Sequence, residues 1–133
     1  QTYAQLEKYL ALKGADLLAD NLDAYISREL TPTPQQHEDA TYTKKIEKPD
    51  GRIELDDLVG DRGWTTFLKY NALHEWPGLF FFARKNTIDM RVKIKEASWN
   101  TALETMEIQR VIPEGKKEMS WKEFLNYINT HNE

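Results

Sequence analysis

The sequence contains no cysteine, which excludes disulfide bonds and thiolate metal sites. Its three histidines stand at no spacing that would bring two of them together as metal ligands on one helix or strand. No segment approaches the roughly 18 consecutive apolar residues of a membrane span, and the first residues lack the basic start and apolar run of a signal peptide. We therefore expect a soluble, cytoplasmic protein without a bound metal.

Signatures of catalysis are equally scarce. The six glycines are scattered, so no phosphate-binding loop or dinucleotide fingerprint is present. His37 falls in a predicted linker, His131 in the C-terminal tail, and His74 is interpreted as a residue at a helix end. None of the three has an activating partner at the spacing that acid–base or nucleophilic catalysis requires. We predict that this chain carries no catalytic residue and acts as a binding module.

An excess of basic charge is also missing, since the net charge is -4. Residues 1–43 contain three basic and seven acidic side chains, whereas residues 44–133 contain fifteen of each. The acidic excess therefore lies entirely in the first third of the chain. Because nucleic-acid affinity depends on local clusters of Lys and Arg, the neutral remainder is compatible with a nucleic-acid partner.

The chain has 133 residues, of which 40% are hydrophobic, and this is enough for one domain with an appendage. Thr2 and Gln5 form a capping-box pattern that predicts the start of a helix, which we expect to continue to about Glu29. Gly14 lies within this helix and suggests a kink or the close approach of another backbone. The helix carries one apolar stripe at helical spacing, made of Leu6, Leu10, Leu17, Leu18, Leu22, Tyr25 and Ile26.

This stripe has no obvious partner in the rest of the sequence. Isolated helices are marginally stable and need tertiary packing, so the stripe predicts a partner domain outside the chain. Two alternatives remain open, in which the helix folds back on the later sheet or dimerises through its stripe.

A linker is predicted over residues 31–41, because Pro32 and Pro34 end the helix and a polar run follows them. Residues 41–46 suit a strand. The turn signal Pro49-Asp50-Gly51 then leads into alternating Ile53 and Leu55, which predicts a loose hairpin.

The remaining segments predict a small antiparallel sheet between two helices, and thus an α+β fold. A short helix capped by Asp61 should end before Pro77, with Trp64, Phe67, Leu68 and Asn71 along one side. Strands are expected at residues 79–83, 88–97 and 106–112, with a tight connection at 85–87. A capping box at Ser120 and Glu123 predicts a C-terminal helix, whose buried side would carry Trp121, Phe124, Leu125 and Ile128.

Three basic clusters are the candidates for ligand binding. The first is Lys44 and Lys45 with Lys48 and Arg52, the second is the strand face formed by Arg91, Lys93 and Lys95, and the third is Lys116 with Lys117. Side chains of one strand face repeat about every 7 Å, a spacing comparable to that of phosphates along a nucleic-acid strand. A solvated face is the alternative interpretation, because acidic residues are interspersed. The predicted nucleic-acid-binding residues are Lys44, Lys45, Arg91, Lys93, Lys95, Lys116 and Lys117.

Several stretches together resemble the methionyl-tRNA formyltransferases, in the order in which that family has them. The stretches are residues 30–35, 40–46 and 50–53, then 72–78 with its Trp76-Pro77-Gly78, then 91–94 and 113–119. The resemblance implies that residues 1–30 are the last helix of a Rossmann-like catalytic domain, 31–41 a linker and 42–133 a C-terminal OB-like domain. The chain is shorter between Ala97 and Met106 than long members of the family, so the barrel is expected to be complete or reduced to an open sheet.

In the family this resembles, the catalytic domain transfers a formyl group from 10-formyltetrahydrofolate to methionine on initiator tRNA. The resemblance implies that this chain helps position the tRNA, that the catalytic residues and the folate site lie upstream, and that the chain alone is inactive. Its implied partners are initiator methionyl-tRNA and the upstream catalytic domain. The alternatives are the C-terminal part of a sugar N-formyltransferase or a non-enzymatic interaction domain that docks a protein through its leucine stripe.

Overall fold

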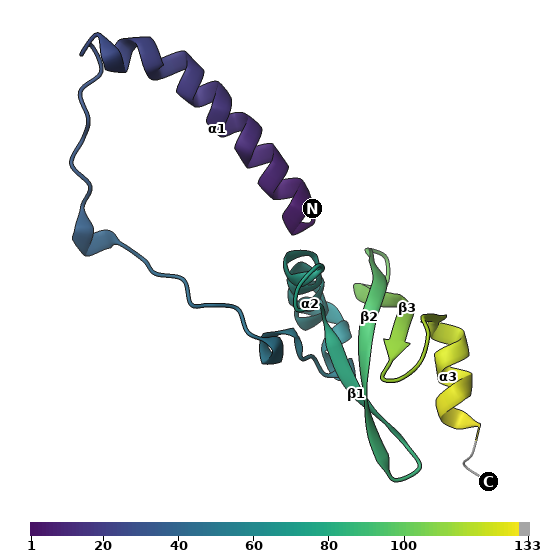
Figure 1. Ribbon diagram of the computed structural model, residues 1–133. Helices are drawn as coiled ribbons and strands as arrows, with labels where there is room; N and C mark the ends of the chain where they lie inside the picture. The colour runs from purple at the N-terminus through teal and green to yellow at the C-terminus, as the bar shows by residue number, and fades with distance from the viewer. Residues whose placement is uncertain (131–133) are drawn as a thin grey trace. The chain divides into compact units, whose positions relative to one another are not determined.

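The computed structural model describes residues 1–130 (Figure 1), so the predicted histidine of the tail, His131, lies outside the described residues. The chain forms two compact units, residues 1–46 and 47–133. Among the described residues, no helix has the length and apolar character needed to cross a membrane.

The first unit is built on the long helix α1, Tyr3–Ile26. The predicted capping box is confirmed, since the backbone N–H of Gln5 donates to the Thr2 hydroxyl and the Gln5 side chain accepts from the Thr2 N–H at 3.0 Å. The helix ends three residues before the predicted limit, where Arg28 adopts a positive φ and turns the chain. No residue of α1 is buried, so its apolar stripe is exposed within this unit. A Cβ on Gly14 would meet nothing within 4 Å, so the expected close approach of a backbone is absent within the described residues.

The predicted strand at 41–46 and its hairpin are wrong. Residues 40–47 have no regular structure, and a 3-10 turn, η2 (Lys48–Gly51), follows them. Pro49 has no N–H for a strand ladder, and the Asp50 carboxylate accepts a hydrogen bond from the Glu47 N–H at 2.8 Å, which closes the turn on itself. A second 3-10 turn, η3 (Leu55–Leu58), follows. Ile53 still enters the core, because its N–H donates to the Phe80 carbonyl at 2.9 Å.

The second unit contains one antiparallel sheet of four strands in the order β1-β2-β3-β4. The strands are β1 (Phe80–Lys85), β2 (Ile88–Asn100), β3 (Thr105–Pro113) and β4 (Met119–Ser120). The predicted α+β class and antiparallel sheet are confirmed, and the predicted alternation buries Met90, Val92 and Ile94. The sheet is open rather than closed into a barrel, and the two-residue strand β4 was not predicted.

Two helices cover the core of this unit. Helix α2 (Gly60–Leu73) has Val59 as its N-cap and no side-chain capping bond, so the predicted capping by Asp61 is wrong. The buried side of α2 holds Gly63, Thr66, Tyr70 and Leu73. At Gly63 the backbone of Leu58 comes so close that an added Cβ would lie 2.4 Å from the Leu58 carbonyl oxygen, and only glycine permits this approach.

Helix α3 (Trp121–Asn129) lies beside β3 (Figure 1) and starts at the predicted capping box of Ser120 and Glu123. Of its predicted inward residues, Phe124 is completely buried, Trp121 and Ile128 are partly buried against the core, and Leu125 is exposed. The Phe124 ring packs edge-on against Phe81 of β1, with 6.0 Å between ring centroids. The core therefore lies between the sheet and these helices, and the opposite face of β1 and β2 is left for other contacts.

Candidate nucleic-acid interface

Arg91 and Lys93 lie together on the face of β2 that points away from the core. In the antiparallel register Phe80 lies opposite Lys93, and Phe82 lies opposite Arg91. Directly opposed residues share a face of the sheet, and the neighbouring positions on β2 are buried in the core. We call the face that bears these two cations and two phenylalanines the outer face. The prediction that Arg91 and Lys93 project from one face is confirmed.

Arg91 is held in a defined position by its neighbours. Its guanidinium lies 3.8 Å from the centroid of the Phe80 ring, within the range of a cation–π contact. Its backbone carbonyl accepts a hydrogen bond from the Glu114 N–H at 2.8 Å. Within residues 1–130 the buried Nε atom of Arg91 has no hydrogen-bond partner, although an N–H in this position ordinarily has one. Arg91 thus contributes a planar cation held against Phe80, and its unsatisfied Nε is buried.

A cavity of about 280 Å³ lies beside Arg91 and Lys93. Three cationic side chains and one carboxylate line it, together with the half-exposed indole of Trp76. The Lys93 side chain also packs against Gly78, where an added Cβ would lie 2.5 Å from Lys93 Cε. We call this the Trp76 cavity, and its lining residues are Lys48, Trp76, Pro77, Arg91, Lys93, Ile112, Pro113, Glu114 and Gly115.

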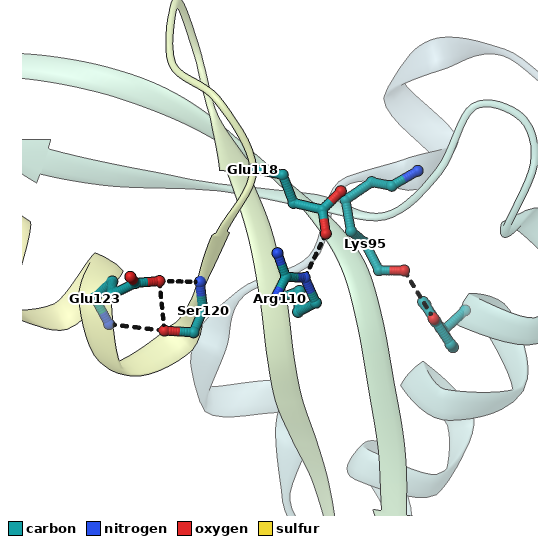
Figure 2. Close-up of polar contacts among 6 residues, drawn as sticks. Lys95, Arg110, Glu118, Ser120 and Glu123 are labelled. Atoms are coloured by element: carbon teal, nitrogen blue, oxygen red, sulfur yellow. Dashed lines mark hydrogen bonds and ion pairs between the residues drawn. The ribbon is translucent and has the colours of Figure 1, made fainter.

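Lys95 does not line the Trp76 cavity, although the strand pattern grouped it with Arg91 and Lys93. The pairing of β2 with β3 shifts register between Ile94 and Glu96, and again after Glu96, so the alternation breaks at Lys95. Its carbonyl oxygen accepts a hydrogen bond from the Tyr70 hydroxyl at 3.2 Å, and Figure 2 shows its side chain extending away from this bond. Burial raises the pKa of Tyr70, which keeps this hydroxyl protonated as a donor.

Ion pairs occupy other cations of the sheet. Figure 2 shows Arg110 of β3 bonded to Glu118, and this contact raises the pKa of Arg110 above its ordinary value. Arg84 of β1 donates to Asp89 at 2.7 Å, which lowers the pKa of that carboxyl. These arginines are less available to an anion than the cations of the Trp76 cavity.

The remaining candidates lie elsewhere. Lys116 and Lys117 are exposed in the loop between β3 and β4, and Lys116 Nζ lies 5.7 Å from the Tyr127 ring of α3. Lys85, which was not predicted as a site residue, lies 3.5 Å from the same ring. Lys44 and Lys45 are exposed in the first unit, in a segment without regular structure.

Sequence reasoning missed the aromatic part of the Trp76 cavity. Trp76 and Lys48 come from two loops that are distant in sequence from Arg91, so no local pattern links them. The Trp76-Pro77-Gly78 stretch was the one signal available. Among residues 1–130, no group of three or more His, Asp or Glu side chains could hold a metal ion.

Comparison with known proteins identifies methionyl-tRNA formyltransferases as relatives, while no family model matches the chain. The methionyl-tRNA formyltransferase of Rickettsia bellii (strain RML369-C) is 30% identical over 148 residues, which cover 97% of this chain and 45% of that protein. The enzyme of the same name from Streptococcus pyogenes serotype M3 is 31% identical over 134 residues, covering 90% of this chain and 42% of its own length.

The methionyl-tRNA formyltransferase of Chloroflexus aurantiacus is 40% identical over 82 residues, or 60% of this chain and 24% of that protein. The chain thus spans between about a quarter and 45% of the length of these relatives. It belongs to the methionyl-tRNA formyltransferase family and corresponds to a C-terminal segment of its members.

Proposed function

We propose that this chain is the tRNA-positioning part of a methionyl-tRNA formyltransferase. The parent enzyme would transfer a formyl group from 10-formyltetrahydrofolate to methionyl initiator tRNA in the cytoplasm, as a step of translation initiation. The chain would contribute an OB-like module that holds the RNA while another domain performs the chemistry. The family relationship and the cation-lined Trp76 cavity support this proposal.

The observation that carries the binding role is the placement of Arg91. A guanidinium offers several N–H donors in one plane and suits phosphate oxygens, and stacking on Phe80 fixes that plane before a ligand arrives. Lys93 and Lys48 add two further cations at the same cavity. Such contacts would position a phosphate backbone without reading its sequence. The proposal keeps Lys44, Lys45, Lys95, Lys116 and Lys117 as further contacts to the same RNA.

The exposed stripe of α1 supports a second partner, the upstream catalytic domain. Leu17, Leu18, Leu22, Tyr25 and Leu30 line a groove of about 510 Å³ within the first unit, and the groove surface is mostly apolar. An exposed apolar groove is unfavourable in water, so this groove favours a partner that covers it. The catalytic residues and folate site would belong to that domain, so this chain alone should produce no formylmethionyl-tRNA. Turnover by the chain alone would contradict this division of labour.

The binding role is tested by titrating initiator tRNA against the chain at several salt concentrations. Replacing Arg91 and Lys93 by Gln removes two phosphate contacts, so the slope of log K against log salt should become shallower by roughly 1.4–1.8. The matched control replaces Arg84 and Arg110 by Gln, which removes the same charge from cations already paired with carboxylates. Binding that does not depend on salt, or an equal loss of slope in both variants, would contradict phosphate recognition at the Trp76 cavity.

A further inference from the structure

We propose that the Trp76 cavity is a subsite for one unpaired nucleotide, with the base stacked on Trp76 and the phosphate held by Arg91 and Lys93. The inference rests on the proposed function, because it takes RNA as the ligand. It adds that the RNA supplies one nucleotide outside a double helix at this site.

The size of the cavity suits a single nucleotide. Sites for small ligands usually begin at roughly 300 Å³, and this cavity of about 280 Å³ lies at that lower limit. A paired helix presents its phosphates on the outside and its bases inside the stack, so it could offer phosphates but no base face to such a cavity. A nucleotide that has left the stack offers both.

Trp76 provides the surface on which a base can stack. Its side chain is 53% exposed, and within residues 1–130 its ring contacts no other aromatic ring. Trp64, by contrast, packs against Trp99 at 5.2 Å, and Trp121 packs against Phe124 at 5.4 Å. Stacking on exposed aromatic rings is a common means of holding unpaired bases. Trp76 is thus a tryptophan whose exposed ring borders the cations of the cavity.

The charges of the cavity favour a nucleotide over a simple anion. The guanidinium of Arg91 lines the cavity and suits a phosphate oxygen, beside the ammonium groups of Lys93 and Lys48. Glu114 lines the same cavity and repels a free phosphate that has no neutral part. A carboxylate accepts hydrogen bonds from the amino and imino groups of bases, so it suits the uncharged end of a nucleotide.

The test compares three probes by quenching of tryptophan fluorescence and by direct affinity. They are a short single-stranded RNA, a nucleoside monophosphate and a blunt RNA duplex. Trp76→Leu should weaken binding of the single strand by roughly 5-fold to 150-fold, the range expected for one stacked base, without changing its salt slope. Binding of the duplex should not change, because it presents no free base.

Two variants keep the result interpretable. Trp76→Phe retains an aromatic ring and should restore most of the affinity that Trp76→Leu loses. Trp64→Leu is the matched control, since Trp64 is exposed to a similar degree, 45%, and lies on α2 away from the lining of the cavity. Thermal melting of each variant by circular dichroism checks that the fold is retained.

The outcomes separate this inference from the proposed function. Salt-dependent RNA binding that is unchanged in Trp76→Leu would overturn the nucleotide subsite and leave the proposed function intact. Absence of salt-dependent RNA binding in the unmodified chain would overturn the proposed function itself. A monophosphate that binds as tightly as the single strand would show that the site takes a free nucleotide and would overturn an RNA-borne one.

Discussion

Substitution of Gly51 by Ala offers a direct test of how the loops that frame the Trp76 cavity are packed. A Cβ at this position would lie 2.2 Å from the Gly78 carbonyl oxygen, a distance at which no real contact exists. Both chain segments are anchored, because the Gly78 N–H donates to the Leu73 carbonyl at 2.8 Å and the Ile53 N–H donates to the Phe80 carbonyl at 2.9 Å. Neither backbone segment can move away from the added Cβ without a loss of stability, whereas the end of a flexible side chain could.

We expect Gly51→Ala to lower the free energy of unfolding of the second unit by about 1–3 kcal/mol, the range for overpacking a well-ordered site. The assay is urea denaturation followed by tryptophan fluorescence. All four tryptophans lie between residues 64 and 121, so the signal reports the second unit alone.

The control for this substitution is Gly14→Ala in α1, where an added Cβ meets nothing within 4 Å. That change should favour the helix by about 1 kcal/mol and leave the tryptophan transition where it was. If Gly51→Ala left the transition midpoint and its slope unchanged, the tight packing of Gly51 against Gly78 would be refuted.

Three further substitutions probe the same unit. Phe124→Ala should cost about 3–5 kcal/mol, because the ring is fully buried, and a smaller loss in urea denaturation would mean that the site collapses around it. Ser120→Ala removes an N-cap oxygen and should cost about 1 kcal/mol at neutral pH. The hydrogen bonds from Ser120 lower the pKa of Glu123 in the folded protein. The stability that these bonds add is therefore present above the ordinary carboxyl pKa, and it is lost as the pH falls through the lowered pKa of Glu123. Ser120→Ala should flatten the acid side of a plot of melting temperature against pH. Tyr70→Phe removes a hydroxyl that accepts from the Ala97 N–H at 3.3 Å and should cost about 0.5–1.5 kcal/mol in the same denaturation assay, whereas an unchanged midpoint would show that water replaces the bond.

Local sequence patterns predicted the helices and strands that are determined by residues close together in the sequence. The alternation of Met90, Val92 and Ile94 places β2, and the capping boxes at Thr2 and Ser120 place the starts of α1 and α3, because each depends on residues within a few positions. The strand expected at 41–46 failed since β-propensity takes effect only beside a partner strand, and within the described residues none pairs with it.

Elements decided by distant contacts were not predictable in this way. Strand β4 has two residues and exists through its pairing with β3. The buried side of α2 includes Gly63 and Thr66 while Trp64 is half exposed, because the backbone of Leu58 passes close to Gly63.

In the candidate site, too, only the residues with a local sequence pattern could be predicted. Arg91 and Lys93 could be predicted from strand alternation, whereas Lys95 could not be excluded because a register shift is a property of two strands. Trp76 and Lys48 reach the cavity from loops, and their placement depends on the complete fold.

Strand β2 is much longer than either of its neighbours, and this has a dynamic consequence for the site. It pairs with β1 through residues 88–93 and with β3 through 92–100, so Val92 and Lys93 appear in both registers (Figure 1). Residues that are flanked by a paired strand on each side exchange their amide protons only when the sheet itself opens, so hydrogen exchange should be slowest at Val92 and Lys93. A ligand held by Lys93 would therefore be anchored to the slowest-opening part of the unit.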